Sequence, residues 1–208
     1  MIAEKYITSS VLISGGSVYK DGKLQFEKKG ELPVDFLIAA YHHFGLKYPK
    51  FYKMDNLAKL GWLSAEILLT GNFNKEKYKP SETGVVLSNA SSSLDTDIRY
   101  YDTVKDMASP ALFVYTLPNI VIGEICISNH FTGENAFFIF EEFDVLFVEQ
   151  YVSNLLNNNI LQSCICGWVE FLEDRYRSAF FLVEKENSGE GLLFSSENLN
   201  KIYQLDNG

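Results

Sequence analysis

Residues 109–144, SPALFVYTLPNIVIGEICISNHFTGENAFFIFEEFD, decide the fold together with SCICGWVE at 163–170. Their pattern predicts a helix over 119–131, a strand over 136–140 and a further helix that Asp144 caps at its start. The segment SCICGWVE is apolar enough to predict a strand buried on both faces. A helix, a strand, a turn, a second helix and a second strand in this order indicate an α/β fold.

The segments on either side continue the alternation of strands and helices. Strands are predicted over 6–14, 84–89 and 178–186, because these runs are rich in β-branched or aromatic residues. The helices predicted from the spacing of apolar residues are 33–44, 54–72 and 94–107.

The chain, 1–208, is therefore predicted to form one domain with a mixed five-stranded sheet and helices on both faces. Residues 15–50 are interpreted as a variable insert, and residues 187–208 as a tail. Within the insert, Asp21-Gly22 predicts a tight turn in an extended ribbon.

Composition excludes several classes of function. The formal net charge of −9 argues against nucleic acid as a partner, because phosphates require clustered Lys and Arg. No apolar run approaches the roughly 20 residues of a membrane span, and MIAEKYITSS lacks the features of a signal peptide. Three cysteines, an odd number inside apolar segments, indicate reduced thiols and a cytoplasmic protein.

Few side chains suggest chemistry. We interpret Cys164 and Cys166 as core residues and predict no metal site and no cofactor. His42 and His43 lie near the C-terminal end of a predicted helix, where positive charge is favoured, and no catalytic partner for them is visible.

Six motifs follow one another along the chain. They are MDNLAKLGWLSAE (54–66), TGVVLSNASSS (83–93), SPALFVYTLPNIVIGEI (109–125), TGENAFFIF (132–140), CICGWVE (164–170) and SAFFLVEKE (178–186). Their order and spacing resemble the N-terminal half of β-ketoacyl-acyl carrier protein synthases, which have the thiolase-like fold. TGENAFFIF is similar to the turn and strand that lead to the family's active-site Cys. Glu170 ends a motif similar to the family's Gly-Gly-Val-Glu strand, with Trp168 in place of the second Gly.

Three departures from the family pattern concern catalysis. The resemblance places the family's nucleophile seven residues after Asn135, where this chain has Glu142, and the family's turn Pro corresponds to Glu134. A carboxylate cannot hold an acyl group as the Cys thiolate does. The resemblance also covers only one half of the family, so the half with two catalytic His residues has no counterpart.

No catalytic residue is therefore assigned. On one interpretation Glu142 is a polar residue at a strand-to-helix turn, where an anion is favourable. On the other it marks a converted site, as in chain-length-factor subunits, which resemble synthases, lack the Cys and shape a partner's pocket. The resemblance implies four acyl-pocket candidates, which are Phe138, Phe140, Glu142 and Phe143.

The resemblance also implies partners. Family dimers pair across the strand that here comprises Ala136, Phe137, Phe138, Ile139 and Phe140. We expect a homodimer or a heterodimer with a full ketosynthase, with an acyl carrier protein as a further candidate. The helix over 144–157 is apolar around more than one stripe, so we expect a partner, a second copy or the 15–50 insert to cover it.

Three functions remain open. The first is a non-catalytic ketosynthase-like protein, or pseudoenzyme, of fatty-acid or polyketide biosynthesis. The second is a small acyl-thioester enzyme that uses Glu142 or Glu141 as an acid or base. The third is an interaction module that retains only the fold. A pocket ending at Glu142 would favour the first two, and a filled interior there would favour the third.

Overall fold

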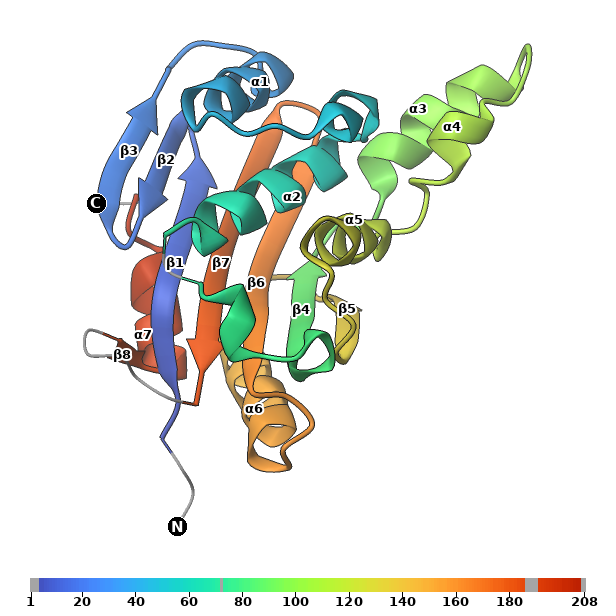
Figure 1. Ribbon diagram of the computed structural model, residues 1–208. Helices are drawn as coiled ribbons and strands as arrows, with labels where there is room; N and C mark the ends of the chain where they lie inside the picture. The colour runs from blue at the N-terminus through green and yellow to red at the C-terminus, as the bar shows by residue number, and fades with distance from the viewer. Residues whose placement is uncertain (1–3, 72, 186–190, 207–208) are drawn as a thin grey trace.

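A mixed β-sheet runs through the computed structural model, which describes residues 4–71, 73–185 and 191–206 (Figure 1). Its order is β3-β2-β1-β7-β6-β4-β5, with β8 paired to β1. β4 is parallel to β5 and β6, whereas β7 is antiparallel to both β6 and β1. The strands are β1 (Tyr6–Ser14), β2 (Ser17–Lys20), β3 (Lys23–Glu27), β4 (Thr83–Asn89), β5 (Asn135–Ile139), β6 (Ser163–Leu172), β7 (Arg175–Glu184) and β8 (Leu192–Leu193).

Helices cover both faces of this sheet, as the sequence predicted (Figure 1). α1, α2 and α5 pack on one face, α6 and α7 pack on the other, and α3 and α4 project beyond the sheet. The helices are α1 (Pro33–His43), α2 (Asn56–Leu69), α3 (Leu94–Val104), α4 (Pro110–Phe113), α5 (Ile120–Asn129), α6 (Val145–Asn157) and α7 (Ser196–Tyr203). Short 3-10 turns lie at Pro49–Lys53, Lys75–Lys77 and Pro80–Glu82.

α2 is the central helix of its layer, and small residues allow it to approach its neighbours closely. A Cβ atom at Gly61 would collide with the side chain of Val121 in α5, so α5 lies closer than a larger residue would permit. Ser64 bonds to Ser178 of β7 through its hydroxyl group at 2.6 Å. Gly61 therefore allows the close approach of α2 and α5, and Ser64 ties α2 to the sheet.

The prediction of five strands was wrong, because the sheet has eight. Residues of the expected insert form the β2–β3 hairpin, which continues the sheet beyond β1. The Asp21-Gly22 turn is present, and both residues have positive φ, as a two-residue hairpin loop requires. Val18 is fully buried, so the hairpin belongs to the core as well as to the surface.

The near-continuous aromatic residues at 136–140 predict a strand covered on both faces. The structure covers each face only in part, because Phe137 packs on the α5 side and Phe138 on the α6 side while the strand itself lies at an edge. β5 is the edge of the sheet, and each of its residues is at least partly exposed. Its Phe138 ring packs against Phe147 and Tyr151 of α6 at 4.8 and 5.1 Å between centroids. α6 thus covers one side of the strand, and no other described strand pairs with its outer edge.

α6 begins at Asp144, whose Oδ1 accepts the Phe147 N–H at 2.9 Å, as predicted. It buries Val148 and Val152 against the sheet, whereas Gln150 and Asn154 on its far side are exposed. That far side is polar, so the expected open apolar face is largely absent from the described helix. α7 lies beside α6, and sequence analysis did not foresee it.

α7 should contribute substantially to stability. Leu199 is fully buried in the α6 layer, so Leu199→Ala is expected to lower the free energy of unfolding by about 2–5 kcal/mol. Its neighbour Asn200 is exposed, and Asn200→Ala should change that free energy by less than about 0.5 kcal/mol. Urea unfolding followed by circular dichroism measures both values, and equal effects would show that α7 is not packed as described.

Candidate functional site

The turn at 140–144 lies at the carboxyl end of β5, where β5 passes into α6. The Phe140 N–H donates to the Asn89 carbonyl at 3.0 Å, which ties this turn to the end of β4. Because β4, β5 and β6 are parallel, their carboxyl ends meet at one edge of the sheet. In an α/β sheet this is the edge at which ligands commonly bind.

Glu141 and Glu142 are both exposed in this turn. Residues 140–146 line an open hollow of about 400 Å³, and the described part of the chain offers neither carboxylate a hydrogen bond or ion pair. His130 ends α5, at the opposite end of β5 from Glu142, and His42 and His43 end α1. The structure therefore places none of these three histidines beside Glu142.

Phe143 points inward from the same turn and fills the space beneath it. Its ring lies 5.0 Å from that of Tyr203, 6.0 Å from Trp168 and 6.2 Å from Phe181, measured between centroids. Burial raises the pKa of the Tyr203 phenol. Glu142 thus lies above a packed aromatic interior and borders only the shallow hollow.

The other two acyl-pocket candidates lie in an aromatic cluster between β5 and α6. Phe138 and Phe140 stack at 5.8 Å, and Phe147 lies within 4.9 Å of both rings. All three are partly buried. The cluster connects the edge strand to the helix after the turn, so a molecule bound to this edge would contact aromatic rings.

Sequence analysis did not single out Glu170 and Arg177 as a pair, yet they face each other on β6 and β7 at the same edge. Glu170 Oε2 accepts the N–H groups of Ala90 and Ser91 at 2.7 and 3.2 Å, which holds the turn after β4. Its buried Oε1 has no hydrogen-bond partner among the described residues. Such an atom is normally satisfied by water or a bound group.

Arg177 holds the end of α7. Its guanidinium forms two hydrogen bonds to Asp206, at 2.6 and 3.0 Å, and another to the Tyr203 carbonyl. Its carbon also lies 4.5 Å from the centre of the Tyr203 ring. The sequence did not predict the contact between Arg177 and Asp206, because Asp206 lies in the expected tail.

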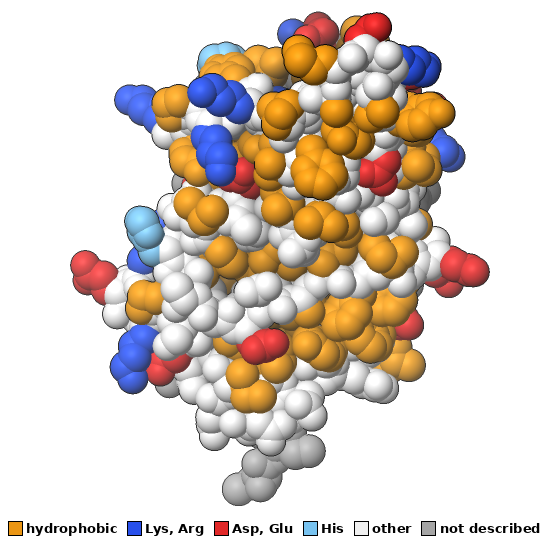
Figure 2. Space-filling view, turned by 90° about the vertical axis from the view of Figure 1, so that its right-hand side faces the viewer, with side chains coloured by type: hydrophobic (Ala, Val, Ile, Leu, Met, Phe, Trp, Pro, Cys, Tyr) orange, Lys and Arg blue, Asp and Glu red, His pale blue; other side chains and the backbone are white. Residues whose placement is uncertain are grey.

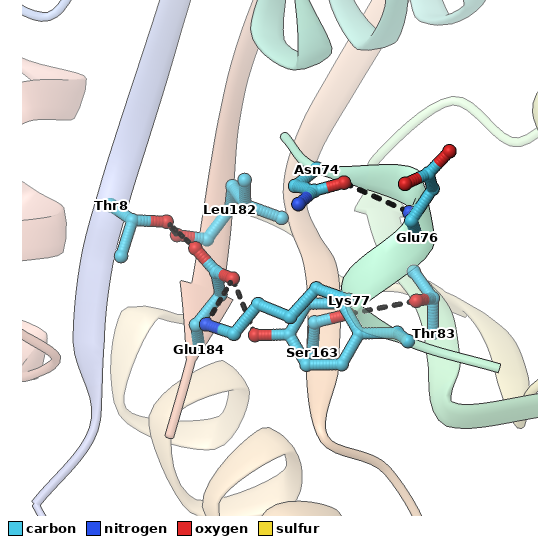
Figure 3. Close-up of polar contacts among 9 residues, drawn as sticks. Thr8, Asn74, Glu76, Lys77, Thr83, Ser163, Leu182 and Glu184 are labelled. Atoms are coloured by element: carbon cyan, nitrogen blue, oxygen red, sulfur yellow. Dashed lines mark hydrogen bonds and ion pairs between the residues drawn. The ribbon is translucent and has the colours of Figure 1, made fainter. Parts of the chain in front are cut away.

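A second polar cluster lies at the opposite end of the sheet (Figure 3). Glu184 accepts hydrogen bonds from the Thr8 and Tyr78 hydroxyls, both at 2.5 Å, and Lys77 Nζ lies 3.5 Å away. Figure 3 shows Thr8 and Lys77 on either side of the carboxylate. Glu184 is buried and these groups surround it, so we interpret the cluster as a clamp that joins β1, β7 and the 75–78 segment.

This interpretation predicts a loss of stability in Glu184→Gln, because the neutral amide leaves these donors poorly satisfied. The free energy of unfolding is expected to fall by about 1–3 kcal/mol. Glu76 is exposed in the same segment, and Glu76→Gln is the matched control with little expected effect. Equal urea midpoints for both variants would argue against the clamp.

The three cysteines are free thiols. Cys164 and Cys166 share one face of β6, because alternate residues of a strand point the same way, and both are fully buried against the α6 layer. Burial raises the pKa of both thiols, and it raises the pKa of Cys126 to about 11. Within 4–71, 73–185 and 191–206 no cluster of potential metal ligands occurs.

The thiols should therefore be unreactive in the folded protein. At pH 8 only about one part in a thousand of Cys126 would be thiolate, and the other two lie out of reach of reagent. We expect slow reaction of at most one thiol with Ellman's reagent in buffer and rapid reaction of all three in guanidinium chloride. Rapid reaction in buffer would instead reveal an activated cysteine.

No protein-family model matches this sequence, and no curated protein matches it. Solved structures do match. The ishigamide ketosynthase/chain length factor has a TM-score of 0.66 and 15% identity, over 90% of this chain and 64% of its own. The type II polyketide ketosynthase AntDE, in complex with the acyl-carrier protein AntF, has a TM-score of 0.59 and 14% identity, over 88% and 63%.

A third match is the ketosynthase in complex with its chain length factor from Xenorhabdus doucetiae, with a TM-score of 0.55 and 10% identity, over 89% of this chain and 80% of its own. The chain thus spans a little under two thirds of the first two structures. These likenesses show the thiolase-like fold of ketosynthases and chain length factors, which confirms the fold that the motifs predicted. Among the described residues, no helix is long and apolar enough to cross a membrane.

Proposed function

We propose that this chain is a non-catalytic, ketosynthase-like subunit that pairs with a full ketosynthase, as a chain length factor does. The observation that carries the proposal is the turn at 140–144. It joins β5 to α6 in a ketosynthase-like fold, yet it contains no Cys, Ser or Thr. Glu142, at the family's nucleophile position, is exposed above a packed interior rather than held beside a proton-transfer partner.

The edge of the sheet supports the part of the proposal that concerns a partner. Ile139 on β5, Ile127 on α5 and Leu146 on α6 are each about half exposed or more. Figure 2 shows hydrophobic side chains spread over this face from top to bottom. Further exposed apolar side chains are Tyr101, Val104, Met107, Phe113, Val114 and Leu117 around α3 and α4. An apolar face of this extent is typical of a protein interface.

Polyketide assembly is the setting that the structural matches support, and fatty-acid assembly is the alternative setting that the motifs suggested. The matched proteins include a ketosynthase with its chain length factor and a ketosynthase with its acyl-carrier protein. By analogy, the partner of this chain would be a full ketosynthase, with an acyl carrier protein as a further contact. The partner would supply the nucleophile. The filled interior beneath Glu142 favours an interaction role over an acyl pocket within this chain, so the partly exposed Phe138 and Phe140 would meet an acyl group only at the interface with the partner.

Pairing can be tested by co-expressing the tagged chain with a full-length ketosynthase encoded in the same genome. A 1:1 complex is expected by size-exclusion chromatography with light scattering. Ile139→Asp on β5 should weaken the complex at least about tenfold, because it places a charge in the apolar interface. Leu24→Asp is the matched control, since Leu24 is equally exposed on the opposite edge strand, β3. Equal effects, or no complex with any such ketosynthase, would contradict the proposal.

A second measurement addresses catalysis. The isolated chain is expected to show no turnover of malonyl- or acetyl-thioesters above background, and Glu142→Gln should change nothing. Turnover that disappears in Glu142→Gln would instead establish the acid–base enzyme as the function of this chain.

A further inference from the structure

The sequence segment that contains β5 carries charged side chains of one sign. From Asp106 to Asp174 the sequence contains ten Asp or Glu residues and no Lys or Arg. This segment forms α4, α5, β5, α6 and β6, and the first four of these elements contribute much of the apolar face in Figure 2. These four elements therefore carry no lysine or arginine of their own. The nearest described lysine to the end of α5 comes from the preceding segment, where Lys75 Nζ donates to Asn129 Oδ1 at 2.9 Å.

Acidic side chains flank β5 at both ends. Glu134 immediately precedes the strand, and Glu141 and Glu142 follow its end. All three are exposed, and none forms an ion pair with another described residue. They remain available to interact with whatever strand pairs with the edge.

If a second copy of this chain paired with β5, negative charges would face negative charges. Two identical edge strands related by a two-fold axis pair antiparallel, so the start of one lies against the end of the other. Glu134 of each copy would then lie near Glu141 and Glu142 of the other copy. Like charges across a strand pair are destabilising, and symmetry makes each repulsion occur twice.

We infer that the edge of β5 is built for a different chain, whose own edge strand is flanked by lysine or arginine, and that these glutamates exclude a homodimer. The inference rests on the proposed use of β5 as the pairing edge. It goes further because it specifies the chemistry of the partner and assigns Glu134, Glu141 and Glu142 a role in selecting it. The apolar centre of the strand supplies affinity, and the acidic ends supply the choice of partner.

The test uses a charge-reversed copy of the chain as the partner with basic flanks. In the variant Glu134→Lys/Glu141→Lys/Glu142→Lys, β5 and its apolar surroundings are unchanged. At low ionic strength we expect wild type and variant each to be monomeric alone and to form a 1:1 heterodimer when mixed. The heterodimer should bind at least about tenfold more tightly than either chain binds itself, measured by sedimentation equilibrium.

Two controls isolate the position of the charges. Glu4→Lys/Asp35→Lys/Glu197→Lys makes the same change in net charge at exposed acids outside β5 and the turn that follows it, and this variant should not pair with wild type. Glu134→Gln/Glu141→Gln/Glu142→Gln removes the repulsion without adding charge, so its self-association should exceed that of wild type. Circular dichroism verifies that each variant is folded.

Salt gives an independent readout. Raising the ionic strength from about 0.01 to 1 M shortens the screening length from about 30 to 3 Å. The mixed heterodimer should therefore weaken, while self-association of the wild type should strengthen. The inference would be overturned by a wild-type homodimer that is tight at low salt, or by equally tight pairing of wild type with the Glu4→Lys/Asp35→Lys/Glu197→Lys variant. Either result would leave the proposed pairing with a ketosynthase standing. If the chain paired neither with the charge-reversed variant nor with a ketosynthase, the proposed function would be contradicted as well.

Discussion

Complete burial of β4 is the constraint on which the other elements depend. All seven of its residues are buried, and it is hydrogen-bonded to β5 on one edge and β6 on the other. Even its polar residues are satisfied internally, since the Thr83 and Ser163 hydroxyls bond to each other at 2.8 Å. Parallel pairing on both edges brings three carboxyl ends together, and there Glu170 holds the turn after β4 while Asn89 holds the turn after β5. The candidate site is therefore a consequence of how β4 is paired.

Local sequence signals predicted the central elements well, because each has a physical cause that acts over a few residues. The short run at 84–89, with Val85, Val86 and Leu87 in succession, predicted a strand covered on both faces, and Asp144 was placed to cap the helix that follows it. The same reasoning misjudged β5. Its aromatic residues indicate burial, but whether a strand is central or at an edge depends on pairing with distant segments, which no local pattern records.

Neither α7 nor the pairing of Glu170 with Arg177 was predicted from the sequence, because both depend on contacts between residues far apart in the chain. α7 lies in a polar stretch that follows a Gly/Ser/Asn-rich segment, and its stability comes from Leu199 in the α6 layer and from the bonds between Arg177 and Asp206. Glu170 could be read as the end of a family motif, but its position opposite Arg177 follows from the register of β6 and β7. Composition therefore suggested a tail where tertiary packing produces a helix.

The two edges of the sheet show different solutions to the same physical problem. An unpaired edge strand offers its backbone groups to any other chain, and proteins commonly discourage this with charge on the strand. β3 follows that rule, since Lys23, Gln25 and Glu27 place polar side chains at alternate positions along it. β5 keeps an apolar strand and places its charges only at the ends. Charge confined to the ends does not prevent pairing in general. It prevents pairing with a strand of like charge, and so leaves the edge open to a partner of opposite charge.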